Sequence, residues 1–169
     1  MFTGYPLSTR KDTVTIAIEG GDVPASAYKG KYKLILRKYC DVILSDFYGK
    51  YTRCWDGGYG TGYGPYQMSV VAGSAVSTGA TTGTIVVSNL WDYGVPTTVK
   101  VALDWTDPAN FKATIADQVY VAADDVWIKA SSSVGTFSSC DQTFVFKYTL
   151  YYKTSGANYY ANQSSDMRR

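Results

Sequence analysis

The chain has 169 residues, which is a typical length for one domain with a hydrophobic core of its own. Hydrophobic residues make up 46% and charged residues 18% of it, and the net charge of +2 gives no reason to expect binding to nucleic acid or to an anionic membrane surface. There is no histidine, which excludes Ser-His-Asp and Cys-His catalysis, nearly all zinc sites and the usual general base at neutral pH.

Short runs of alternating apolar and polar residues, rich in Val, Ile, Thr and Tyr, predict a chain built from β-strands. The predicted strands are, in chain order, 13–19, 32–37, 42–44, 66–71, 84–88, 98–105, 111–115, 119–121, 126–129 and 143–153. Turn sequences such as Gly20-Gly21 and Asp107-Pro108 separate them. This spacing predicts an all-β fold, either an antiparallel β-sandwich or a lipocalin-like up-and-down barrel of about 8–10 strands.

The two ends of the chain carry weaker patterns. Residues 1–29 are predicted to be a linker with an N-terminal strand, and residues 30–169 a single β-domain. Residues 22–28 favour a brief helical turn. The polar tail from Ser155 to Arg169 has no alternation, so we expect a last edge strand or a frayed end there.

The three cysteines, Cys40, Cys54 and Cys140, form no CxxC motif, so the sequence contains neither a metal knuckle nor a redox motif. Cys40 could pair with Cys54 and leave Cys140 free, or all three thiols could be reduced. The sequence leaves both readings open.

The segment from Phe47 to Tyr66 stands out, because seven of its twenty residues are aromatic and six are glycine. Glycine allows positive φ angles and a close approach of the backbone, so we expect an irregular loop. Tyr and Trp offer flat apolar faces with a polar tip, which suits stacking on sugar rings. The alternative is that the rings plug one end of a barrel or form a ladder over a hairpin.

A second aromatic loop spans Asn89 to Gly94 and would extend the first if both lie at the same end of the fold. Trp105 and Trp127 alternate with apolar neighbours and are predicted to lie in the core. The predicted ligand-binding residues are Tyr51, Trp55, Asp56, Tyr59, Tyr63, Tyr66, Trp91 and Tyr93.

We find no pattern typical of catalysis or of cofactor binding. Paired carboxylates could serve a glycosidase, but none of the aspartates lies in a recognisable setting. The calcium loop Asp-x-Asp-x-Asp-Gly is missing, and the glycine string at 57–62 does not stand between a strand and a helix, as a dinucleotide-binding loop would. We therefore expect no enzyme activity, no metal ion and no cofactor.

Two parts of the chain are similar to a known family. Val42 to Gly49, followed by the Gly/Tyr-rich segment and Tyr66-Gln67-Met68, resembles the C-terminal β-domain of Bacteroidetes surface lipoproteins associated with glycan-uptake systems of the starch-utilisation type. The runs Phe111 to Gln118, Trp127 to Lys129 and Gly135 to Tyr148 fit the same pattern. The resemblance covers about residues 30–153.

The resemblance implies an exported protein on the extracellular face of the outer membrane, held there by a lipid anchor. The lipobox cysteine and the upstream Ig-like domain of the family are not in this chain, and Met1 to Lys11 lacks the plan of a secretory signal, so we expect these parts to precede it. The implied partners are an oligosaccharide or polysaccharide and other outer-membrane proteins. No nucleic-acid partner is expected.

The resulting hypothesis is a non-catalytic cell-surface accessory domain that binds glycans through its aromatic loop. Two alternatives stay open. One is a structural or interaction subunit of a surface or virion assembly, since Tyr and Trp are also enriched at protein interfaces. The other is a lipocalin-like barrel that encloses a small apolar ligand.

Overall fold

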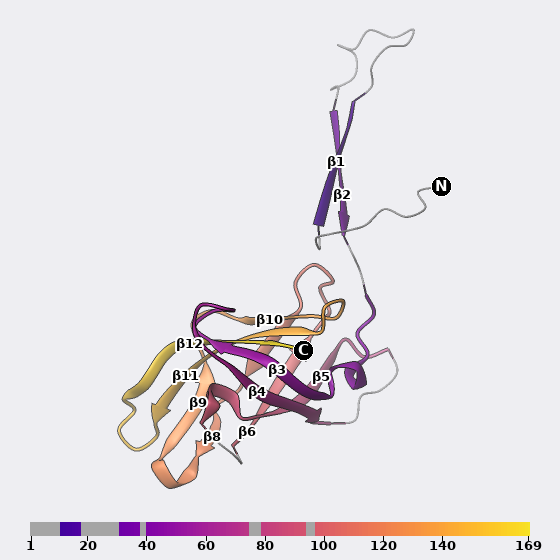
Figure 1. Ribbon diagram of the computed structural model, residues 1–169. Helices are drawn as coiled ribbons and strands as arrows, with labels where there is room; N and C mark the ends of the chain where they lie inside the picture. The colour runs from indigo at the N-terminus through magenta and orange to yellow at the C-terminus, as the bar shows by residue number, and fades with distance from the viewer. Residues whose placement is uncertain (1–10, 18–30, 38–39, 75–78, 94–96) are drawn as a thin grey trace, which may run out of the picture. The chain divides into compact units, whose positions relative to one another are not determined.

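The computed structural model describes residues 11–17, 31–37, 40–74, 79–93 and 97–169, with side chains from residue 40 onward. It divides into two compact units, Met1–Cys40 and Asp41–Arg169. In the first unit, β1 (Lys11–Ala17) pairs antiparallel with β2 (Lys31–Arg37), as Figure 1 shows. Because its partner is β1, the strand at Lys31–Arg37 belongs to this hairpin, whereas we expected the β-domain to begin at residue 30. The helical turn expected at 22–28 lies outside the described residues.

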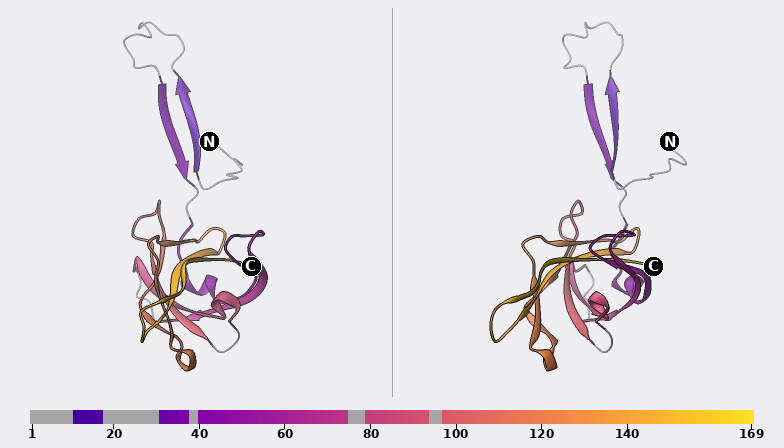
Figure 2. Two further views of the ribbon diagram at one scale, coloured as in Figure 1. Left: turned by 90° about the vertical axis from the view of Figure 1, so that its left-hand side faces the viewer. Right: turned by 60° about the vertical axis from the view of Figure 1, so that its left-hand side comes forward.

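The second unit is a closed antiparallel β-barrel of eight strands (Figure 2). Its sheet order is β10-β7-β6-β5-β4-β3-β12-β11, and a further pairing of β10 with β11 closes the ring. The strands of this unit are β3 (Gly49–Asp56), β4 (Tyr63–Ala72), β5 (Thr82–Ser88), β6 (Thr98–Asp104), β7 (Lys112–Ile115), β8 (Gln118–Val121), β9 (Val126–Ala130), β10 (Gly135–Ser138), β11 (Thr143–Tyr152) and β12 (Asn158–Arg168). Of the two predicted architectures, the lipocalin-like up-and-down barrel is therefore the one that forms.

The strands β8 and β9 form a hairpin inserted between β7 and β10 in the meander. The long strand β11 pairs with β10 near its start and with β9 over Tyr148–Tyr152, so the insertion lies along the same edge of β11. The side-chain amide of Gln118 donates to the backbone oxygen of Lys100 and accepts from its N–H, each at 2.9 Å. This amide joins β8 to β6 as a backbone ladder pair would.

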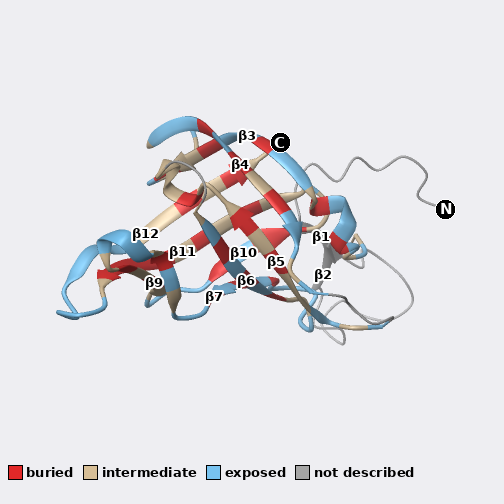
Figure 3. Ribbon diagram, turned by 90° about the horizontal axis from the view of Figure 1, so that it is seen from below, coloured by how far each residue is buried: buried red, intermediate tan, exposed pale blue. Residues whose placement is uncertain are grey.

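Side chains fill the interior of the barrel. Along β6, for example, Val99, Val101 and Leu103 are buried while the residues between them are not, as expected for strands with one face inward (Figure 3). The phenylalanine rings at 137 and 144 stack at a centroid distance of 6.0 Å. An eight-stranded barrel is wide enough either to be filled by side chains or to hold one small ligand, and the cluster of buried side chains here favours the first.

Several sequence predictions need correction. Val42–Leu44 is no strand, because Leu44 opens the 3-10 helix η2 (Leu44–Phe47), which packs Leu44 and Phe47 against the core. The segment Phe47–Tyr66 is not one irregular loop, since most of it forms the hairpin of β3 and β4. The tail forms β12, which is no edge strand because it pairs with both β11 and β3.

The two tryptophans predicted to be core are half-buried. Trp105 packs against the core, with its ring edge-on to Phe137 at 6.5 Å. The ring of Trp127 faces the ammonium of Lys153 at 4.2 Å. Trp105 therefore contributes packing from the rim of the core, whereas the contact of Trp127 is with a lysine.

The cysteines also differ from the pairing considered above. Cys40 and Cys140 are each disulfide-bonded, whereas Cys54 is free and fully buried. The thiol of Cys54 points into the barrel and donates to the backbone oxygen of Tyr51 at 3.3 Å, so it is not available to Cys40. Among the described residues, helix is limited to short 3-10 turns, and none of it has the length and apolarity that a membrane crossing requires.

Candidate ligand-binding site

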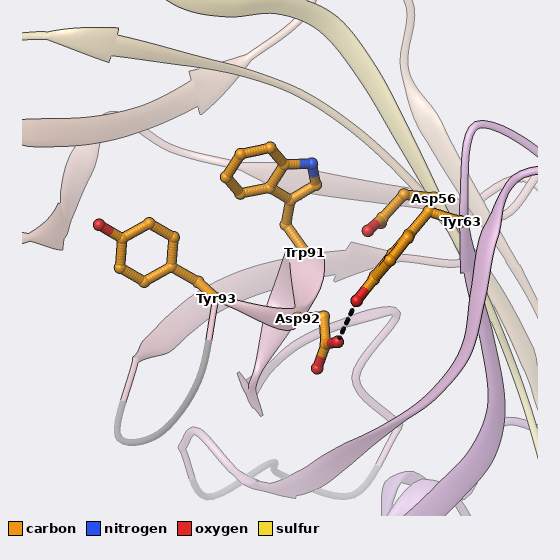
Figure 4. A pocket seen from close by; sticks show the side chains of 5 residues that line it. All are labelled: Asp56, Tyr63, Trp91, Asp92 and Tyr93. Atoms are coloured by element: carbon orange, nitrogen blue, oxygen red, sulfur yellow. Dashed lines mark hydrogen bonds between the residues drawn. The ribbon is translucent and has the colours of Figure 1, made fainter.

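One end of the barrel carries a pocket of about 460 Å³, drawn in Figure 4. The up-and-down path brings together at this end the turn between β3 and β4 and the 3-10 helix η3 (Leu90–Asp92) that follows β5. The pocket volume falls in the range of about 300–1,000 Å³ that is usual for small-molecule sites. The residues that line it are Asp56, Tyr63, Trp91, Asp92 and Tyr93.

The first side of the pocket is set by a tight glycine turn between β3 and β4. Asp56 ends β3 opposite Tyr63, which begins β4. A Cβ on Gly62 would lie 1.7 Å from the backbone oxygen of Asp56, so only glycine fits at this position. The glycine at this position therefore allows the end of β3 and the start of β4 to lie close together beside the pocket.

The second side is set by a strained turn at η3. Asn89, Trp91 and Asp92 all have positive φ angles, of 60°, 60° and 44°, which are unfavourable for residues with a side chain. The turn is held from below by Leu90, which is fully buried and whose backbone oxygen accepts a hydrogen bond from the Tyr120 hydroxyl. The Asn89 amide also donates to Asp92 Oδ1 at 3.1 Å. With Leu90 anchored in the core, Trp91 and Asp92 line the pocket.

The floor of the pocket is a buried carboxylate. Asp56 is only 7% exposed, and its Oδ1 accepts hydrogen bonds from the Tyr66 hydroxyl at 2.8 Å and from the Ser165 hydroxyl. Ser165 in turn shares a hydrogen bond of 2.7 Å with the hydroxyl of Tyr148. Among the residues that the structure describes, no group donates a hydrogen bond to the other oxygen, Oδ2. Figure 4 shows this carboxylate directed toward the space between Trp91 and Tyr63.

Burial raises the pKa of Asp56, because water no longer solvates the ionised form. The hydrogen bonds from Ser165 and Tyr66 act in the opposite direction, and the nearby charge of Asp92 adds to the increase. Burial likewise raises the pKa of Tyr66 and of Tyr148, so both phenols keep their protons at neutral pH.

The walls of the pocket are aromatic. The rings of Trp91 and Tyr93 are nearly parallel, 22° apart, with centroids 6.2 Å from each other. The hydroxyl of Tyr63 donates to Asp92 Oδ2 at 2.9 Å and closes the opposite side. Tyr159 and Tyr160 at the start of β12 contact the Trp91 ring, at centroid distances of 5.9 Å and 4.6 Å. The aromatic surface therefore continues beyond the pocket.

The charges at the pocket are all negative. The described residues that line it include no lysine or arginine, and Asp92 is held by the uncharged donors Tyr63 and Asn89. Outside the lining, Asp124 accepts a hydrogen bond of 2.5 Å from the hydroxyl of Tyr93, and this bond raises the pKa of Tyr93 to about 12. In the part of the chain that the structure describes, the acidic residues do not form a cluster suited to a metal ion.

The structure brings together half of the predicted site residues. Both aromatic segments lie at the same end of the barrel, and one pocket there is lined by Asp56, Tyr63, Trp91 and Tyr93. Tyr66 lies beneath the floor through its bond to Asp56.

The other predicted site residues lie elsewhere. Tyr51 is fully buried in the barrel, where its hydroxyl donates to Phe47 at 2.9 Å, so no ligand can reach it. Trp55 and Tyr59 form a separate edge-on pair at 4.6 Å, and the guanidinium of Arg168 lies 3.7 Å from the centre of the Tyr59 ring. These two rings do not line the pocket.

Sequence reasoning missed the residues that support the pocket. Asp92 stands between two predicted residues, Trp91 and Tyr93, so its position was a usable signal. Ser165 and Tyr148, in contrast, come from the polar tail and from a core strand, and nothing in their local sequence indicates a role beneath Asp56.

Fold and site together define a class: a lipocalin-like up-and-down barrel with a filled interior and an acidic, aromatic pocket at one end. Comparisons of the chain with protein-family models, curated proteins and solved structures give no match. Its function is therefore argued from the pocket itself.

Proposed function

We propose that the barrel is a non-catalytic saccharide-binding domain and that the ligand lies in the pocket beside Trp91. The observation that carries this proposal is the meeting of three aromatic residues and two carboxylates in one pocket of suitable size. The C–H faces of a sugar ring pack on aromatic rings, and its hydroxyls donate hydrogen bonds to carboxylate oxygens. The carboxylates of Asp56 and Asp92, both in the lining, provide such acceptors.

The backbone of η3 supports the same proposal. Strained φ angles at non-glycine residues are kept only where the surrounding structure enforces them, and they concentrate at functional sites. Here they occur at Trp91 and Asp92, two of the five residues of the lining. The buried Leu90 and the Asn89 amide hold the turn in place before any ligand arrives, which lowers the entropy lost on binding.

The proposal includes a location. By its resemblance to the surface lipoproteins named above, the domain acts on the extracellular face of the outer membrane as an accessory that holds glycans for partner proteins there. Saccharide binding by the pocket does not depend on this location.

The test compares two tryptophan variants. Trp91→Ala removes the aromatic face from the pocket, whereas Trp55→Ala removes a tryptophan that packs on Tyr59 outside it. We expect soluble polysaccharides to retard the wild-type protein and the Trp55→Ala variant on affinity gels. Trp91→Ala should weaken binding by about 30-fold, as loss of an aromatic hot spot does.

Two results would count against the proposal. One is that no polysaccharide in a broad panel retards the wild type, and the other is that both variants bind equally. A third measurement addresses catalysis: incubation with the retarding polysaccharide should release no new reducing ends.

A further inference from the structure

The pocket concentrates negative charge that no basic side chain in the described part of the chain neutralises. Within that part, only hydroxyl and amide groups are seen to donate hydrogen bonds to its carboxylates, Asp56 and Asp92, and to Asp124, which accepts from Tyr93. The salt bridge found among the described residues joins Lys153 to Asp117 and does not involve any of them. Charged side chains that are fully buried are normally paired, so the environment of Asp56 is unusual.

The unpartnered oxygen of Asp56 marks the place of a donor. Asp56 is only 7% exposed, and no group among the described residues donates to Oδ2, although Oδ1 accepts two hydrogen bonds. Leaving such an acceptor unsatisfied costs free energy, and more so when it is charged. Oδ2 is itself closed off from solvent, so a ligand donor that reaches it after a shift of the lining recovers that loss.

The aromatic residues favour a cation at the same place. Trp91, Tyr63 and Tyr93 surround the carboxylates, and the face of an aromatic ring attracts an ammonium group. An ammonium has three N–H donors and a full charge, so it satisfies Oδ2 and balances Asp56 and Asp92 together. A neutral hydroxyl supplies the hydrogen bond but leaves the charge in place.

We propose that the saccharide of this pocket is an amino sugar, whose protonated amine lies beside Asp56 and Asp92 while its ring packs on Trp91. The inference rests on the proposed function and names its ligand class. Attraction by the whole chain does not explain such a preference, because the net charge is +2 and repels cations at long range.

The experiment compares three trisaccharides that share one β-1,4-linked backbone and differ at carbon 2. Fully deacetylated chitotriose has an amine there, N,N′,N″-triacetylchitotriose an acetamide and cellotriose a hydroxyl. Isothermal titration of the whole chain at low salt should show chitotriose binding at least about tenfold more tightly than either neutral sugar, the gain of a charged over a neutral hydrogen bond.

Variants show whether the preference comes from the pocket. Asp92→Asn should reduce the preference for chitotriose over cellotriose by about tenfold, because the amide can still accept a hydrogen bond from a hydroxyl but no longer carries a charge. Asp56→Asn should do the same if thermal unfolding shows that this variant folds. If it does not fold, the Asp92→Asn variant alone tests the proposal. Asp107→Asn is the matched control, since Asp107 caps the exposed turn after β6 by accepting from the Ala109 N–H at 2.9 Å.

The outcomes separate this inference from the proposed function. Equal binding of chitotriose and cellotriose would overturn the amino-sugar inference and leave saccharide binding intact. A chitotriose preference that Asp92→Asn and Asp107→Asn reduce equally would overturn it too, because the attraction would then be general. If none of the trisaccharides binds and polysaccharides fail as well, both proposals fall.

Discussion

At the scale of single residues, Asp56 links the stability of the barrel to its pocket. Its carboxylate is buried at the floor of the pocket and held by Tyr66 and Ser165, and burial raises its pKa. Between the usual pKa of an aspartate and this raised value, the folded state binds more protons than the unfolded state. Ionisation of Asp56 therefore lowers the free energy of unfolding as the pH rises through this window.

Asp56→Asn should remove that loss, because an amide does not ionise. We expect the difference in unfolding free energy, variant minus wild type, to increase as the pH rises from the usual aspartate pKa of about 3.9 and to level off above the raised value. Urea unfolding followed by tryptophan fluorescence at a series of pH values measures it. A difference that stays constant with pH would contradict the raised pKa.

Asp104→Asn is the control with the opposite sign. The N–H of Thr106 donates to Asp104 and lowers its pKa, so ionised Asp104 stabilises the fold above the usual aspartate pKa, and this stability is lost as the pH falls through the lowered value. The variant should therefore lose stability relative to wild type as the pH rises, where Asp56→Asn gains it.

At the scale of elements, the β3–β4 hairpin shows what the glycines of the Phe47–Tyr66 segment do. The composition predicted an irregular loop, but the two strands form an antiparallel pair in which Lys50 lies opposite Ser69 and Asp56 opposite Tyr63. Within the turn, the N–H of Gly62 donates to the backbone oxygen of Gly58 at 3.0 Å. The glycines thus serve close backbone approach inside an ordered element.

Gly62→Ala should damage stability and site together. Its Cβ would meet the backbone of Asp56 at 1.7 Å, so the turn must open and displace that carboxylate. We expect a loss of at least about 1–3 kcal/mol in unfolding free energy, as for other overpacked positions, and weaker saccharide binding. Thermal unfolding and affinity gels measure the two effects.

Thr61→Ala in the same turn is the matched substitution, because Thr61 is exposed. It should change the unfolding free energy by no more than about 0.5 kcal/mol. Equal effects of the two variants would show that the close approach at Gly62 is not what holds the turn.

At the scale of the whole barrel, closure decides which groups solvent can reach. β12 fills the gap between β11 and β3, with Met167 opposite both Phe144 and Cys54. A closed barrel has no free sheet edge, so Cys54 becomes accessible when strands separate. Burial raises the pKa of its thiol to about 11.

Thiol labelling without reductant should therefore report opening of the barrel. In urea we expect one reactive thiol per chain, because Cys40 and Cys140 are disulfide-bonded. In the native protein near pH 8, labelling of Cys54 should be at least about a hundredfold slower, since so little of the thiol is ionised. Cys54→Ser should give no labelled thiol in urea, and three labelled thiols in the wild type would contradict the disulfide assignment.

Much of the fold follows from local patterns, and much of the site does not. Alternation located most strands because the side-chain period of a half-buried strand is two, as at Thr98–Asp104. It missed β12, since only Ser165 and Met167 of that strand are buried and one of them is polar. It also missed β3, where glycine and aromatic composition concealed the pairing.

The sequence by itself determined an all-β domain without histidine chemistry and marked Asp56, Tyr63, Trp91 and Tyr93 as candidates. Only the tertiary structure decided between sandwich and barrel, because both use the same alternation and differ in which strands meet at the seam. It also separated the pocket residues from Trp55 and Tyr59, and it buried Asp56 with an unpartnered oxygen. Burial and charge balance depend on contacts between residues distant in the chain, such as Asp56 and Ser165, which local patterns do not record.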